Sequence, residues 1–446
     1  MVRRFFYRQF RIASRVQWSV GRRLTPAGRL VAGALAAALV FGPNTRLTVG
    51  YQAFTLLLAL LVLAALCALV PPPALDVRRR LPRYATAGER LTYHVVLRQR
   101  RSRPVAGLSL LEDFDDPRPT LEAFATATEP GESRRNWFDR KVAWHRWAWL
   151  VARNRRLDIG EHRVSEVRPG QEVTIAVGGL ARRRGRVRFR GLTLARPDPL
   201  GLVRALRPMA APDTLLVLPR RYPLPLLALP GARRYQPGGI ALASSVGDSE
   251  EFVSLREYRP GDPLKRIHWR SSARVGRAVV REHQDEFFVR HGLILDTFAP
   301  VAVEDRFEEA VSVAASFAAG VHAQDSLLDL MFVGPNEYVF TAGRGVGDLE
   351  RMLEILADVR PCVDRPFAAL HRLVAERHHS LSGVICILVA WDDARRALVR
   401  HLRALGVPAL TLLVTETADE PADEELEFEG VRRLVRGRVA EGLARL

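Results

Sequence analysis

The chain has 446 residues, 48% of them hydrophobic and 26% charged, so it is long enough for two or three domains with real cores and is not a disordered polymer. Its 67 Lys and Arg outnumber its 49 Asp and Glu, and the formal net charge of +18 suggests an acidic partner such as nucleic acid or the anionic face of a membrane. Three isolated cysteines form no CxxC pair and no zinc spacing, which fits a reduced compartment without a disulfide framework.

The placement of the charge favours a membrane over nucleic acid. Eight arginines lie between residues 3 and 29, and the first acidic residue of the chain is Asp76. A nucleic-acid binder needs aromatic residues that stack on bases among its cations, and the best such cluster, near Trp144, is better explained by lipid. We therefore predict a lipid bilayer as a partner and no nucleic acid.

Residues 1–23 form a basic leader that we expect on the cytoplasmic side of the membrane. Aromatic residues interleave with its arginines, which is typical of segments that lie in a membrane interface. These aromatic residues are Phe5, Phe6, Phe10 and Trp18. The alternatives are a disordered basic leader and an organellar transit peptide, since the segment is rich in Arg and contains no acid.

Two apolar stretches within residues 24–70 predict a transmembrane hairpin. The second, 49–70, has no charge and reaches the ~20 residues that cross ~30 Å of hydrocarbon. The first, 24–42, is long enough only if Arg29 extends toward the headgroups. Its apolar part alone, 30–42, also suits a signal-peptide core or a buried helix.

Flanking cations predict the orientation of this hairpin. The turn between the stretches carries Arg46, whereas the outer flanks carry the leader's arginines and Arg78, Arg79, Arg80 and Arg83. Because cationic flanks stay on the cytoplasmic side, we expect a multi-pass protein of the inner (plasma) membrane with both termini in the cytoplasm.

Residues 74–212 predict an antiparallel β-domain, which we expect to resemble a sandwich rather than a barrel. Short alternating runs at 91–99, 107–113 and 186–195 are typical of strands with one wet face. A Trp-rich insertion at 137–157 interrupts them. We expect Trp144, Trp147 and Trp149 to lie at the membrane interface; the alternative is a helix whose aromatic face packs on the β-domain.

A linker and a distinctive segment, 251–286, occupy residues 213–287. Within the segment, Asp262 is placed to cap a helix that begins at Pro263 and stops at Gly276. The helix gathers cations on one face, which is either simply solvated or binds an acidic partner. We expect His268 to be packed rather than catalytic. The partner-binding candidates are Arg256, Tyr258, Arg259, Asp262, Lys265, Arg266, His268, Trp269, Arg270 and Arg274.

This segment resembles the signature of the family catalogued as domain of unknown function 58, which reads close to LREYRPGDPLRRIHWRASAR. The run RRGR at 183–186 followed by DPLGL at 198–202 resembles a second element of that family. The resemblance implies a membrane-tethered protein with a β-rich middle and a C-terminal domain similar to von Willebrand factor A. It also implies a partner, because such proteins are often paired with MoxR-type AAA+ ATPases.

Residues 288–446 alternate between apolar strands and helices, which predicts an open α/β fold with a parallel sheet covered on both faces. We expect helices at 304–322, 347–359 and 366–378. An acidic stretch, 419–429, precedes an expected terminal helix from about 430.

Asp296 and Asp392 follow two of these strands and are the candidates for a metal site at the rim of the sheet. Domains similar to von Willebrand factor A hold magnesium through a DxSxS pattern. Here Phe298 and Pro300 stand at the two serine positions. We therefore expect no metal and no cofactor, and Asp296 to cap the turn after its strand or to contact the segment 251–286.

The sequence contains no HExxH, SxxK or GxSxG motif, so we expect no enzyme. The favoured function is a membrane-anchored, non-enzymatic adaptor that works with a MoxR-type ATPase in assembly or remodelling of cell-envelope complexes. The alternative is a metal-dependent ligand-binding module of the adhesion type on the opposite side of the membrane.

Overall fold

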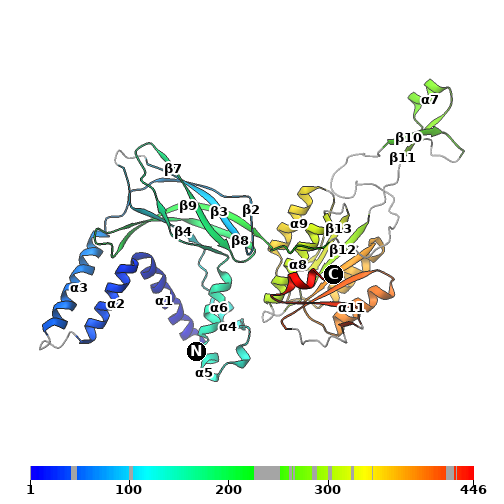
Figure 1. The fold of residues 1–446 in the computed structure, drawn as a ribbon. Coiled ribbons are helices and arrows are strands. Elements are labelled where there is room, and N and C mark those ends of the chain that lie inside the picture. Colours follow the sequence, from blue (N-terminus) through cyan, green and yellow to red (C-terminus); the bar gives the residue numbers. More distant parts are fainter. Residues whose placement is uncertain are drawn as a thin grey trace. The chain divides into compact units, whose positions relative to one another are not determined.

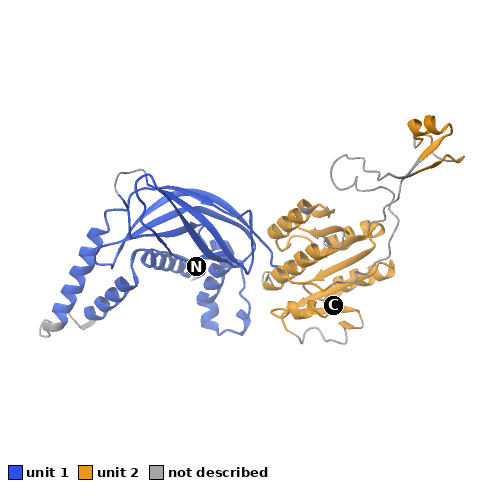
Figure 2. Ribbon diagram, turned by 45° about the horizontal axis from the view of Figure 1, so that its top comes forward, with its two compact units in different colours: residues 1–220 blue, residues 221–446 orange. Residues whose placement is uncertain are grey.

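A computed structural model describes residues 2–41, 48–99, 104–225, 252–260, 264, 267–283, 289–299, 304–322, 326–343, 345–417, 426–427 and 429–446. Two compact units make up the chain, residues 1–220 and 221–446 (Figure 2). The first unit joins three long helices to a β-domain with a small helical insertion. The second unit contains a six-stranded sheet with helices and a two-stranded module (Figure 1).

The basic leader is a helix, so the alternative of a disordered leader is wrong. Helix α1 (Val2–Arg23) is 22 residues long and strongly amphipathic. Its Tyr7 and Phe10 pack against Phe124 and Trp147 of the helical insertion, and this apolar contact holds the helix in place.

Helix α2 (Pro26–Phe41) begins two residues after the predicted start at Leu24. Leu24 instead forms a β-bridge with Val203, and the Thr25 hydroxyl accepts a hydrogen bond from the Gly28 amide at 3.0 Å. Thr25 is therefore the N-cap and Pro26 is the first helical residue, and both residue types are favoured at these positions.

Helix α3 (Thr48–Cys67) is, within the described residues, the one helix long and apolar enough to cross a membrane, over Gly50–Cys67. It ends three residues before the predicted Val70. Helix α2 has 16 residues, and at ~1.5 Å per residue its length of about 24 Å falls short of the ~30 Å hydrocarbon core. The two helices run side by side (Figure 1).

Two sheets form the β-domain, in the orders β1-β3-β7-β5 and β2-β9-β8-β4-β6. Their pairings are antiparallel except for β2 with β9. The strands are β1 (Asp76–Arg80), β2 (Tyr84–Thr86), β3 (Arg90–Arg98), β4 (Leu108–Phe114), β5 (Leu157–Ile159), β6 (His162–Val164), β7 (Glu172–Ala181), β8 (Gly185–Pro197) and β9 (Arg204–Leu218). Strand β9 continues past the domain end expected at 212.

Both sheets contribute to one hydrophobic core, with Tyr93 and Val177 from the first and Phe189 and Leu215 from the second. Along β8 the arginines at 186, 188 and 190 are exposed while Val187 is buried, which confirms the predicted alternation. The helical insertion follows β4 and consists of α4 (Leu121–Thr126), α5 (Trp137–Val142) and α6 (Trp144–Asn154).

The turn at 198–202 docks the start of α2 onto the β-domain. The Asp198 carboxylate accepts hydrogen bonds from the amides of Leu200, Leu202 and Val203 at 2.7–2.8 Å. The Leu202 carbonyl thus fixed accepts the Thr25 amide at 3.1 Å. A Cβ on Gly28 would lie 1.9 Å from the same carbonyl oxygen, so only glycine permits this approach.

The large sheet of the second unit has the order β14-β13-β12-β15-β16-β17 and is parallel except for β14. Helices α8 and α9 cover one face and α10 and α11 the other (Figure 1). Its strands are β12 (Arg290–Leu295), β13 (Leu327–Val333), β14 (Glu337–Ala342), β15 (Gly383–Leu388), β16 (Ala409–Thr415) and β17 (Val431–Val435). Its helices are α8 (Glu304–His322), α9 (Val346–Asp358), α10 (Ala368–Arg377), α11 (Asp393–Ala404) and α13 (Val439–Leu443).

The predicted terminal helix from 430 is wrong. Residues Val431–Val435 form β17, which pairs with β16, and the short helix α13 follows it. Val431 and Leu434 are buried in the sheet, and this burial outweighs the arginines between them. Most of the acidic stretch lies outside the described residues, but Glu429 is buried and accepts hydrogen bonds from Arg400 and Arg403 of α11.

We predict that Gly28→Ala displaces α2 from the turn at 198–202, because the added Cβ meets a backbone carbonyl. The expected loss is about 1–3 kcal/mol of unfolding free energy. Thermal unfolding of the full chain in detergent measures it. Gly33→Ala is the matched control, since it lies in the same helix with nothing within 4 Å. Equal melting temperatures for the two variants would contradict the docking.

Candidate functional site

The distinctive segment folds as a small module. Strands β10 (Phe252–Glu257) and β11 (Val279–His283) pair antiparallel, and helix α7 (Trp269–Val275) lies between them in the chain. Gly276 ends the helix at φ 73°, as predicted. The predicted helix start at Pro263 lies outside the described residues; Ile267 forms a β-bridge with Val280, and α7 begins at Trp269.

Seven of the ten partner-binding candidates lie within the described residues; Asp262, Lys265 and Arg266 lie outside them. Trp269 is 69% exposed, and Arg270 and Arg274 of the same helix are exposed as well. His268 is half-buried, with Nδ1 2.7 Å from the Ser271 hydroxyl, so it supports the start of α7. Tyr258 and Arg256 are half-buried, whereas Arg259 is exposed.

This module presents an apolar and cationic surface. Leu264, Trp269 and Val275 are exposed large apolar side chains. Trp and Arg are the residues most enriched in the hot spots of protein–protein interfaces. The arrangement offers groups that can bind a protein surface.

At the carboxyl ends of β12 and β15 the two metal candidates meet around an arginine. Arg395 of α11 donates from Nε to Asp296 Oδ2 at 2.8 Å and from Nη2 to Asp296 Oδ1 at 3.2 Å, and its Nη1 contacts Asp392. Nη2 also donates to the Phe298 carbonyl at 2.9 Å. The guanidinium therefore fills the position between the carboxylates that a cation would need.

Burial sets the electrostatics of this cluster. Asp296 is fully buried, and its desolvation raises the pKa of the carboxyl, which the Arg395 guanidinium and the amides of Phe298 and Val389 oppose. Burial lowers the pKa of Arg395, but the two carboxylates outweigh it and the pKa is raised. The Phe298 amide also donates a hydrogen bond to Asp296 Oδ1, which confirms that Asp296 caps the turn after its strand. A bound Mg²⁺ would have to displace a paired arginine.

The Trp-rich insertion packs against α1, and the prediction that Trp147 lies at the membrane interface is wrong. Trp147 is 2% exposed and contacts the rings of Tyr7, Phe10 and Phe124. The partner is α1 rather than the β-domain that the alternative named. Trp149 is half-buried beside Arg153, and Trp144 is partly exposed against Phe10.

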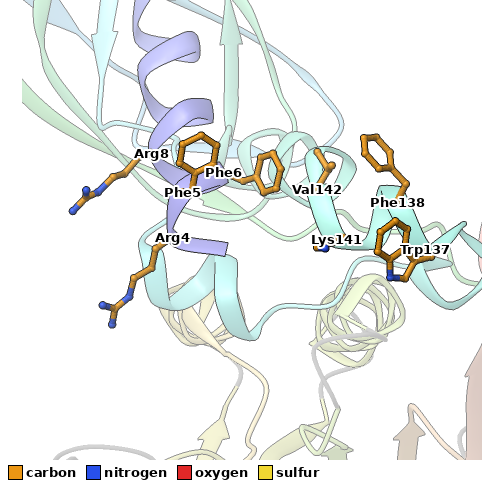
Figure 3. A pocket seen from close by; sticks show the side chains of 8 residues that line it. All are labelled: Arg4, Phe5, Phe6, Arg8, Trp137, Phe138, Lys141 and Val142. Carbon is orange, nitrogen blue, oxygen red and sulfur yellow. The ribbon is translucent and has the colours of Figure 1, made fainter. Parts of the chain in front are cut away.

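A recess between α1 and α5 joins Phe5 and Phe6 of the basic leader to Trp137 and Phe138, for which the sequence predicted no surface. It encloses about 770 Å³ and is open to the outside. We call it the aromatic recess; its lining residues are Arg4, Phe5, Phe6, Arg8, Trp137, Phe138, Lys141 and Val142 (Figure 3). The signal in the sequence is the doublet Trp137-Phe138, which precedes the three tryptophans that were predicted at the membrane interface.

Two histidines meet on neighbouring helices of the second unit. His371 Nε2 of α10 lies 2.6 Å from His401 Nδ1 of α11. Burial lowers the pKa of His371, and the positive charge that His401 can carry lowers it further. No sequence motif joins the two residues, because they lie thirty positions apart.

Residues 254–440 match the model of a family described as Protein of unknown function DUF58. The match lies wholly within the second unit and includes most of the module. A curated relative is the Uncharacterized protein YeaD of Bacillus subtilis (strain 168), 28% identical over 178 residues. The aligned part covers 39% of this chain and 42% of that protein, so this chain spans less than half the length of the relative.

We predict that Arg395→Met destabilises the second unit by about 3–5 kcal/mol, because Asp296 is left as a buried carboxylate without a counter-charge. Chemical denaturation monitors the loss. Arg372→Ala is the control, since Arg372 pairs with Glu337 at an exposed site and should shift the midpoint little. If both variants unfold at the same denaturant concentration, the ion pair does not stabilise the rim.

We also predict that the second unit loses stability as the pH falls below the ordinary histidine pKa of ~6.5. The fold lowers the pKa of His371, so the neutral form is favoured; its contribution is present above that pH and is lost on acidification. His371→Gln should weaken the dependence of melting temperature on pH, and the buried His291, whose pKa burial also lowers, keeps the remainder. His379→Gln, at an exposed histidine, should keep the wild-type slope. A wild-type slope in His371→Gln would contradict this origin.

Proposed function

We propose that this chain is a non-enzymatic adaptor that is held in the cytoplasmic membrane by α3 and binds a cytoplasmic partner through its second unit. The partner would be a MoxR-type AAA+ ATPase, and the task would be assembly or remodelling of cell-envelope complexes. The observation that carries this proposal is the exposed surface of α7, with Trp269 beside Arg270 and Arg274.

The proposed anchor is supported by α3, because its side chains contact almost no other part of the protein. Over Gly50–Cys67 only 6% of the residues are buried. Helix α2 pairs with it as a shorter second element, so the proposed topology is a hairpin that enters and leaves on one side. The arginines of α1 and of β1 would then lie on the cytoplasmic side, with both termini.

The identity of the partner rests on family resemblance, and the structure supplies a surface of suitable chemistry. The open sheet with helices on both faces agrees with the proposal that the second unit resembles von Willebrand factor A. The module adds apolar and cationic groups that can contact an acidic partner surface. The Arg395 ion pair counts against the alternative of a metal-dependent adhesion module, because it already neutralises Asp296 and Asp392.

We predict that a photo-crosslinker at Trp269 captures an AAA+ ATPase in living cells. Trp269→benzoylphenylalanine places the reactive group on α7, and Val363→benzoylphenylalanine is the matched control, since Val363 is 66% exposed on the α/β part of the same unit. The adducts are identified by mass spectrometry after purification of the full-length chain. An ATPase enriched at position 269 over position 363 is expected.

Two results would contradict this part of the proposal. Adducts at 269 that contain no ATPase, obtained while both variants are present in the membrane at normal amounts, would remove the partner from the proposal. Capture of the same proteins in the same amounts at both positions would show that exposure alone explains the adducts.

A further inference from the structure

We propose that the aromatic recess between α1 and α5 binds anionic phospholipid of the membrane that holds α3. This inference rests on the membrane anchoring proposed above and adds a second, ligand-specific contact with the same bilayer. Its residues belong to the first unit and take no part in the proposed binding of a protein partner.

The walls of the recess are apolar and aromatic. Trp137 is 66% and Phe138 64% exposed on α5, and Phe5 is 59% exposed on α1. Figure 3 shows Phe6 pointing toward Val142 across the recess. Groups of this size are normally removed from water, and an acyl chain or the glycerol region of a lipid would cover them.

Three cations lie at the edges of these walls. Arg4 and Arg8 lie on α1 and point away from α5 (Figure 3), while Lys141 lies 4.8 Å from the centre of the Trp137 ring. Within the described part of the chain, Arg4, Arg8 and Arg15 form no ion pair, and α1 has no acidic residue. Asp139 is the one acidic residue of α5. The charge therefore suits a phosphate-bearing amphiphile.

A second groove continues the cationic surface along α1. It lies between α1 and the start of α4, and four arginines line it: Arg4, Arg8, Arg11 and Arg15. On the same helix, Ile12 and Val16 are exposed large apolar side chains that recur with Phe5 at helical spacing. An exposed apolar stripe with arginines along its flank is the composition of helices that lie in a membrane interface.

The position of the recess within the first unit agrees with a bilayer as its occupant. The pair α2 and α3 and the pair α1 and α5 extend to the same side of the β-sheets in both views (Figures 1 and 2). The Arg22 side chain of α1 donates to the Glu112 carbonyl at 2.8 Å and contacts Asp113, which fixes α1 on the β-domain. A membrane that contains α3 is therefore within reach of the recess.

Quenching of tryptophan by brominated phospholipid tests the proposal on the full-length chain in nanodiscs. A minor fraction of brominated phosphatidylglycerol or brominated phosphatidylcholine is placed in a phosphatidylcholine disc. The emission of the wild type minus that of Trp137→Phe reports Trp137. We expect brominated phosphatidylglycerol to remove most of this difference emission and brominated phosphatidylcholine to remove much less.

Two variants provide the controls. The double variant Arg4→Gln/Arg8→Gln should abolish the preference for phosphatidylglycerol, since it removes the cations beside the recess. Trp269→Phe, at an equally exposed tryptophan in the second unit, should give a difference emission that neither brominated lipid reduces.

Three outcomes separate failure of this site from failure of the anchor. A chain that does not incorporate into discs at all contradicts the anchoring itself. Incorporation with an unquenched Trp137 overturns the lipid site alone. Equal quenching by the two lipids overturns the assignment of an anionic headgroup.

Discussion

A charge-free helix with almost no protein packed on it is the constraint on which the rest of the first unit depends. The fully buried Ala64 of α3 packs near Leu202 of the docking turn, while Leu56, Leu63 and Leu66 are more than half exposed. Leaving one such side chain in water costs about 1.5–3 kcal/mol relative to burying it, so a row of them favours an apolar medium. The proposed bilayer would supply that medium, and the turn at 198–202 fixes where α2 begins.

The chain's excess of arginine divides into two groups with different tasks. One group is buried and pairs with carboxylates: Arg79 with Glu112, Arg146 with Glu132 and Arg395 with Asp296. Each of these arginines stabilises the domain that contains it and cannot attract a partner. Arg4, Arg8 and Arg15 lie on the surface of α1 without a carboxylate among the described residues, and they remain available for anionic lipid. Net charge alone did not distinguish the groups: Arg79 looked like a flanking cation of the membrane hairpin and is part of the β-domain core.

Local patterns in the sequence predicted those elements whose cause is local. The uninterrupted apolar runs of β12, β15 and β16 and the stop of α7 at Gly276 are of this kind. Features that depend on distant residues were not visible: Trp147 is buried because Tyr7 and Phe10 lie against it, and Arg395 pairs with Asp296 across ninety-nine positions. The edge strand β17 was not predicted, because the arginines between Val431 and Leu434 interrupt the apolar pattern that marks a buried strand. The start of α2 was placed too early, because the β-bridge from Leu24 to Val203 cannot be seen in the local sequence.

Alkaline carbonate extraction of membranes from cells that produce the intact chain tests the central claim most directly. The treatment releases proteins held by charge, including any held through the arginines of α1 alone, and leaves proteins whose helices lie in the hydrocarbon. The account predicts that the full-length chain stays in the membrane pellet. Recovery of the folded chain in the supernatant, without detergent, would show that α3 is not embedded in lipid and would contradict the account.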